Sequence, residues 1–173
     1  MVEVKLRAVR VDLQSNTPVL LLQESEGLGR TLPIFIGAPE ATAIAFALQG
    51  MDTPRPMTHD LIRDLLDALG TSVVRVVITE LRTATYFAEI VLRQGDLELP
   101  VSSRPSDAVA VAVRTGTPLF VADDLMDSEG IMLAVDEDED EESDEDDEGA
   151  NPDELVGEFR TFLDSIRPED FSS

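Results

Sequence analysis

The alternation of apolar and polar residues predicts that the chain begins with β-strands. Apolar and polar residues alternate from 2 to 13, as in a strand with one buried face, and the alternation slips at Ala8-Val9. A slip of this kind indicates a β-bulge. Two further β-prone segments follow at 18–23 and 30–36, with glycines between them. The first part of the chain is therefore predicted to form three consecutive strands.

Two helices are predicted next. Pro39 suits the first turn of a helix because its missing N–H is not needed there, and the apolar run 39–49 ends at Gly50, which favours a left-handed cap. Thr58 has the side chain of an N-cap residue. The segment after it carries apolar residues at helical spacing, which predicts an amphipathic helix with the stripe Leu61, Ile62, Leu65, Leu66 and Leu69.

The same order of elements then repeats. Strands are predicted at 72–82, 84–93 and 97–101, followed by an apolar run at 105–114, a short strand at 117–122 and a short helix after Asp123. Valines in the apolar run favour a strand, and period alone cannot assign such a run. We predict a helix because Pro105 and Asp107 fit a first turn and because the matching segment 39–49 is rich in alanine. The pattern indicates an α+β fold made of a duplicated three-strand, two-helix unit.

Charge divides the chain into three predicted parts. The formal net charge is −23, and residues 136–150 contain 12 acidic residues and no base. This segment is predicted to be a disordered acidic linker, because a block of like charge cannot bury itself. Residues 1–135 form the predicted globular domain. Residues 151–173 are predicted to form an amphipathic helix and tail, with the apolar stripe Leu155, Val156, Phe159, Phe162, Leu163 and Ile166.

Composition excludes several classes of protein. The chain has no cysteine, so disulfides and thiolate metal sites are excluded. It has no apolar stretch long enough to cross a bilayer and no continuous apolar region near its start, so we expect a soluble, cytoplasmic protein without membrane contact. The predicted globular part also lacks the basic cluster that non-specific nucleic-acid binding requires.

Four acidic residues occupy related places in the two copies of the repeat. A metal-dependent nuclease needs carboxylates that hold Mg²⁺ or Mn²⁺ beside the scissile phosphate. If the two halves pack about a pseudo-twofold axis, four acids could meet at one such site. The alternative is that each acid simply stabilises a helix N-terminus through the helix dipole. The candidate metal ligands are Glu40, Asp60, Asp107 and Asp124.

His59 is the only histidine in the chain, and it directly precedes Asp60. A neutral imidazole at a helix start suits a general base that activates water. His59, Asp60 and Asp107 are therefore the candidate catalytic residues. The alternative role for His59 is a structural hydrogen bond at the entry to its helix.

Two arginines precede prolines at the starts of predicted helices. Arg55 and Arg104 are candidate phosphate-binding residues, because a guanidinium beside a helix N-terminus suits an anion. A structural ion pair, such as Arg104 with Asp107, is the alternative. Ser106 is a weaker candidate nucleophile, since only His59 could activate it.

Three strings together resemble the bifunctional nuclease domain of bacteria and plants. They are PIFIGAPEA (33–41), RPMTHDLIRDLL (55–66) and SRPSDAVAVAVRTGTPLFV (103–121), and the tail FRTFLDSIRPEDF (159–171) is similar to tails of bacterial members. The resemblance covers about residues 1–135. It implies a duplicated unit that closes into a mixed, barrel-like sheet with helices packed outside, and it implies DNase or RNase activity. It assigns no catalytic residue.

These observations leave two classes of function open. One is a divalent-metal-dependent nuclease of low sequence specificity that acts on DNA, RNA or both. The other is a non-enzymatic, oligomeric module that binds a protein through the acidic linker and the terminal helix. A third possibility joins them, with the acidic segment mimicking a nucleic-acid backbone in the domain's own site. The apolar helices predict a homo-oligomer, with a dimer favoured.

Overall fold

The described part of the chain contains one mixed β-sheet. The structure is a computed structural model that describes residues 1–51 and 53–133, so the predictions for the acidic segment and the C-terminal helix lie outside the described residues. A register shift between Leu6 and Ala8 confirms a bulge in the first strand, close to the slip in the sequence pattern. The strands are β1 (Val2–Asp12), β2 (Thr17–Glu24), β3 (Thr31–Phe35), β4 (Ser72–Arg82), β5 (Thr85–Gln94), β6 (Leu97–Ser103) and β7 (Leu119–Val121).

The strand order shows the predicted repeat and corrects the predicted closure. β1, β2 and β3 form one antiparallel meander, and β4, β5 and β6 form a second. The order is β3-β2-β1-β7-β4-β5-β6, with β7 antiparallel to β1 and parallel to β4. The barrel-like closure was a wrong prediction: β3 and β6 lie at opposite ends of the sheet, and β7 joins the two meanders at their inner strands instead.

Four helices accompany the sheet in the described residues. They are α1 (Ala38–Leu48), α2 (Thr58–Ala68), α3 (Pro105–Thr115) and α4 (Asp123–Glu129). The prediction of a helix rather than a strand at 105–114 is confirmed. As predicted, Gly50 past the end of α1 adopts left-handed backbone, with φ of 61°, and Gly116 at the end of α3 does the same, with φ of 65°. None of the four helices is long and apolar enough to span a bilayer.

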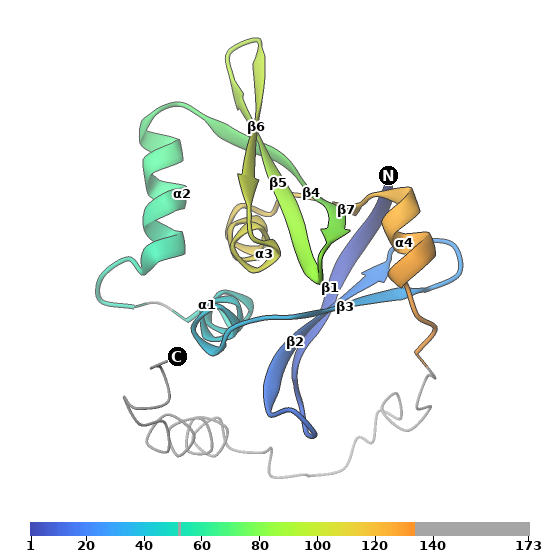
Figure 1. Cartoon of the computed structure of the whole chain (residues 1–173). Coiled ribbons are helices and arrows are strands. Elements are labelled where there is room, and N and C mark those ends of the chain that lie inside the picture. Colours follow the sequence, from blue (N-terminus) through green and yellow to red (C-terminus); the bar gives the residue numbers. More distant parts are fainter. Residues whose placement is uncertain (52, 134–173) are drawn as a thin grey trace, which may run out of the picture. The chain divides into compact units, whose positions relative to one another are not determined.

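Helix α3 is the centre of the packing. It contacts α1 and α2 on its flanks and β4 and β5 beneath it, and it is seen nearly end-on between these elements in Figure 1. The five residues from Ala108 to Ala112 are all 0–2% exposed. Alternating alanine and valine explains this burial, because small side chains let neighbouring helices and strands approach an apolar surface closely. The helices next to α3 therefore pack closely against it.

The interpretation of α2 needs two corrections. Met57, not Thr58, occupies its N-cap position, and Thr58 is already helical. The apolar stripe is also largely left uncovered, because His59 is the one buried residue of α2. The leucines of the stripe at positions 61, 65 and 69 are 50%, 53% and 67% exposed. The helical period predicted the stripe correctly, but it does not say which neighbour covers it.

Candidate functional site at a junction of three helices

Three helices each carry an acidic residue at their third position. These residues are Glu40 in α1, Asp60 in α2 and Asp107 in α3. A carboxylate in the first turn is stabilised by the free backbone N–H groups and the dipole of the helix. Stabilisation of a helix N-terminus, the alternative role named for these acids, is therefore consistent with the position of all three. Their partners decide what else these acids do.

Arg104 joins α1 to α3. Its Nη2 lies 2.7 Å from Glu40 Oε1 and 3.0 Å from Asp107 Oδ1, and its Nε donates to Asp107 Oδ2 at 2.7 Å. A Cβ on Gly37 would collide with Glu40 Oε2, so the glycine leaves room for Glu40 to fold back over the start of α1. The Arg104 side chain is 65% exposed, whereas Glu40 is only 16% exposed. The Arg104 guanidinium thus forms ion pairs with two acids, while most of the Arg104 side chain remains exposed to solvent.

His59 adds α2 to the same cluster. Its Nε2 lies 3.2 Å from Asp107 Oδ1. Because the Asp107 carboxylate is the acceptor, we assign the proton to Nε2, which leaves Nδ1 unprotonated. His59 is 7% exposed. Its Nδ1 has no hydrogen bond within the described ranges. It is not one of the fully buried, unpaired side-chain atoms there, which are Ser25 Oγ and Thr31 Oγ1. His59 Nδ1 therefore keeps contact with solvent. We call Glu40, His59, Arg104 and Asp107 the three-helix junction.

The charge state of Asp107 follows from its neighbours. Burial alone would raise the pKa of its carboxyl. Hydrogen bonds from Arg104 and His59 lower that pKa by more than burial raises it, so the pKa lies below its ordinary value. The acids around Arg104 raise the pKa of its guanidinium in turn, with Asp107 the stronger contributor and Glu40 the second. Asp107 is therefore ionised at neutral pH and orients the imidazole as an acceptor.

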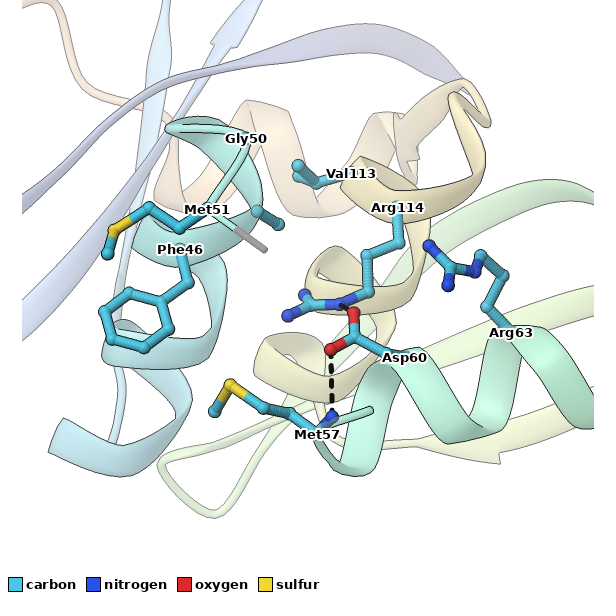
Figure 2. A pocket seen from close by; sticks show the side chains of 9 residues that line it. Phe46, Gly50, Met51, Met57, Asp60, Arg63, Val113 and Arg114 are labelled. Atoms are coloured by element: carbon cyan, nitrogen blue, oxygen red, sulfur yellow. Dashed lines mark hydrogen bonds and ion pairs between the residues drawn. The ribbon is translucent and has the colours of Figure 1, made fainter. Parts of the chain in front are cut away.

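Asp60 belongs to a second, separate network (Figure 2). Arg114 Nε donates to Asp60 Oδ1 at 2.6 Å, and the Met57 backbone N–H donates to Asp60 Oδ2 at 3.0 Å. Arg114 also donates to the carbonyl oxygens of Ala110 at 3.0 Å and Ala43 at 2.9 Å. Its side chain is only 4% exposed. Arg114 thus connects α3 to both α1 and α2 through hydrogen bonds. This network lies on a different side of α2 from His59.

Sequence reasoning missed Arg114. It had one signal: Arg114 is the only charged residue in the apolar run from Ala108 to Gly116. A charge within a buried helix must find a partner, because an unpaired buried charge is costly. An acid on a neighbouring helix was therefore to be expected, and Asp60 fills that role.

The remaining candidates lie elsewhere. Arg55 is exposed between α1 and α2. Asp124 is exposed on α4, and no hydrogen bond or ion pair to it is found among residues 1–51 and 53–133. Ser106 is 5% exposed on α3 and forms no hydrogen bond with His59 in the described part of the chain. The structure thus brings together Glu40, His59, Arg104 and Asp107, and it places Asp60, Arg55 and Asp124 apart from them.

The junction does not fit a resident divalent ion as it stands. Two of the four candidate acids, Glu40 and Asp107, do converge on one cation, and that cation is the Arg104 guanidinium. Asp60 is neutralised by Arg114. Among the described residues, no group of three or more histidine, aspartate and glutamate side chains could hold a metal ion. Carboxylates already paired with arginine have little charge left for Mg²⁺ or Mn²⁺.

Comparison with known sequences relates this chain to one domain family. Residues 20–134 match the sequence model of the bifunctional nuclease domain. An uncharacterized protein of Mycobacterium tuberculosis is 43% identical over 171 residues, which cover 99% of this chain and 98% of that protein. Bifunctional nuclease 2 and bifunctional nuclease 1 of Arabidopsis thaliana are 32% and 30% identical over 117 and 119 residues. These matches cover 66% and 67% of this chain but only 36% and 37% of the plant proteins.

Proposed function

The chain belongs to the bifunctional nuclease domain family, and we propose that its three-helix junction binds and hydrolyses a phosphodiester of DNA or RNA. The observation that carries this proposal is the His59–Asp107 pair beside the exposed Arg104. An imidazole oriented by a carboxylate is the arrangement of a general base. The Arg104 guanidinium next to it donates to Glu40 and Asp107 through two of its nitrogens, but it is 65% exposed and can also contact a phosphate oxygen. Similarity to the plant proteins called bifunctional nucleases, at 32% and 30% identity, supports the reaction class without assigning these residues.

The proposed reaction uses the junction residues in defined roles. His59 Nδ1 accepts a proton from water, and the water oxygen attacks phosphorus as the bond to the leaving oxygen breaks. The leaving oxygen takes a proton from solvent, so the products are a phosphomonoester and a free hydroxyl. Asp107 stabilises the imidazolium through Nε2. Arg104 stabilises the charge that develops on the phosphoryl oxygens, and Glu40 holds Arg104 in place.

The predicted Mg²⁺ or Mn²⁺ requirement remains a prediction. Because Arg104 occupies the position between Glu40 and Asp107, the proposed reaction uses only side chains of the junction. Cleavage with and without a chelator tests this part of the proposal separately.

Replacing Arg104 by glutamine tests the junction as a phosphate site. We expect Arg104→Gln to lower kcat/KM for a labelled oligonucleotide by roughly 10²- to 10³-fold, the usual loss when one charge-stabilising donor is removed. The matched control is Arg82→Gln: Arg82 pairs with Glu80 on β4 and is 63% exposed. Both variants are purified in parallel with the wild type, so a contaminating nuclease would act equally in all three. Equal activity in the three preparations would contradict the assignment.

A second candidate function, an oligomeric protein-binding module, is favoured by exposed apolar residues. Leu61, Leu65 and Leu69 on α2 are at least half exposed, and alternate residues of the edge strand β6 (Leu97, Leu99 and Val101) are 44–65% exposed. The end of β5 contacts the end of α2, where Gln94 Nε2 donates to the Leu69 carbonyl at 3.5 Å. Apolar faces of this kind mark protein contacts. Nucleic acid as a ligand, and a protein partner for the C-terminal helix, likewise stay predictions.

A homodimer through these faces has a direct test. Sedimentation of the full chain at micromolar concentration should show a dimer, and Leu65→Lys should shift it to monomer without loss of folded structure, because Leu65 is 53% exposed. Leu28→Lys, at an exposed residue in the β2–β3 turn, is the control and should remain dimeric. A monomeric wild type would exclude this arrangement.

A further inference from the structure

A pocket opens beside the junction, between the end of α1 and the start of α2. Its volume is about 200 Å³, smaller than the sites that hold drug-sized ligands and suited to a single ring system. Figure 2 shows its two kinds of wall. Phe46, Met51 and Met57 form an apolar side. Polar groups of α2 and α3 form the other, and the full lining is Phe46, Ala47, Gly50, Met51, Met57, Asp60, Arg63, Val113 and Arg114.

The apolar side suits a flat, aromatic ligand. Phe46 is half-buried on the last turns of α1, and the two methionines approach from the segment between the helices. Aromatic faces stack on nucleobases without requiring a particular sequence, and methionine sulfur packs well against ring edges. The pocket thus offers a surface for one face of a base.

The polar side offers an acceptor. Each Asp60 oxygen receives one N–H, from Arg114 and from Met57, and a carboxylate oxygen can accept more than one hydrogen bond. The Asp60 side chain is 21% exposed, so a ligand can reach it. A carboxylate accepts from an exocyclic amine such as that of cytosine. It repels a carbonyl oxygen at the same place, so a contact of this kind favours cytosine over uracil.

Position links the pocket to the junction. Asp60 and His59 are neighbours on the first turn of α2, and their side chains point about 100° apart around the helix axis. Along α3, Asp107 and Arg114 are seven residues apart, or about 10 Å. A nucleotide extends about this far from its phosphate to the far edge of its base. One nucleotide can therefore place its phosphate at the junction and its base in the pocket.

We propose that this pocket is the nucleobase subsite of the domain, with Phe46 against the face of the base and Asp60 accepting a hydrogen bond from an exocyclic amine. The inference rests on the proposed function, since it takes the phosphate to lie at the three-helix junction. It goes beyond it by naming the part of the substrate that is recognised and a preference for amino-bearing bases.

Equilibrium binding of two mononucleotides tests the subsite without catalysis. Cytidine and uridine 5′-monophosphate differ on one edge of the ring, where cytidine has an exocyclic amine beside an unprotonated N3 and uridine has a carbonyl oxygen beside N3–H. We expect the full-length protein to bind the cytidine nucleotide roughly tenfold more tightly, as one good base contact provides. Phe46→Ala should weaken cytidine nucleotide binding about fivefold or more, through the loss of stacking. Leu48→Ala should not, because Leu48 is 52% exposed on the same helix and does not line the pocket.

The outcomes separate the subsite from the nuclease proposal. Equal affinity for the two nucleotides, no binding of either, or unchanged binding by Phe46→Ala would overturn the subsite, even if the protein cleaves nucleic acid. Selective, Phe46-dependent binding by a protein with no cleavage activity would support the subsite and count against the proposed reaction.

Discussion

Glutamine in place of His59 will lower the rate of phosphodiester cleavage by about 10²- to 10⁴-fold and leave the fold intact. The glutamine amide can donate the hydrogen bond that His59 Nε2 gives to Asp107 Oδ1 at 3.2 Å. It cannot take a proton from water near neutral pH, because an amide is not a base. The substitution therefore keeps the structural role of the side chain and removes the proposed catalytic one. Initial rates on a labelled oligonucleotide, measured beside thermal unfolding, give both readouts.

His59→Ala provides the contrast for this experiment. It removes the hydrogen bond as well as the base and leaves a cavity at a residue that is 7% exposed. We expect it to be inactive and also less stable than His59→Gln. If His59→Gln is fully active while His59→Ala is merely unstable, the histidine is structural, and the base must be sought elsewhere in the chain.

Replacing Arg114 by methionine will lower the free energy of unfolding by about 3 kcal/mol, near the lower end of the range for breaking a buried ion pair. The Arg114 side chain is 4% exposed and donates to Asp60 and to two backbone carbonyl oxygens. Methionine fills most of its volume, so the loss reports the missing hydrogen bonds and the unpaired Asp60. Urea unfolding measures the change. Arg63→Met is the control: Arg63 is 40% exposed and pairs with Asp64, so it should change stability by less than about 1 kcal/mol.

The pH dependence of stability gives Arg114 a second readout. Burial alone would raise the pKa of Asp60. Hydrogen bonds from Arg114 and the Met57 backbone outweigh this effect, so the pKa lies below its ordinary value of 3.8. A carboxyl whose pKa is lower in the folded state stabilises the fold above its unfolded pKa, and that stability is lost as the pH falls below it. The free energy of unfolding of the wild type should therefore fall as the pH drops through about 4. The fall should be shallower in Arg114→Met, and identical profiles would contradict the pairing.

Local pattern was sufficient to predict the secondary structure. Pro105 and Asp107 identified a helix where the valines alone favoured a strand, because a first turn has specific requirements that an apolar run does not share. Closure of the sheet was not predictable in this way. It depends on whether β3 meets β6, and the insertion of β7 between β1 and β4 sets the outer strands at opposite ends. That arrangement is a long-range outcome of packing.

For the candidate site, the sequence likewise predicted the positions of acidic residues at helix starts but not the partners of those residues. The repeat identified Glu40 and Asp107, which the fold brings together, because both begin helices that pack on each other. It related Asp60 to Asp124 in the same way, but these two lie in different surroundings, one facing Arg114 and the other exposed on α4. Equivalent positions in a duplicated sequence share backbone geometry. Their partners differ because the neighbouring elements of the two copies differ.

A crystal structure of the full-length protein with a phosphorothioate dinucleotide that has cytidine as its 3′ nucleoside tests the central claim most directly. The account predicts the phosphorothioate group within hydrogen-bonding distance of Arg104 and His59 Nδ1, at the start of α1, α2 and α3. A dinucleotide whose phosphorothioate binds away from these residues would contradict it.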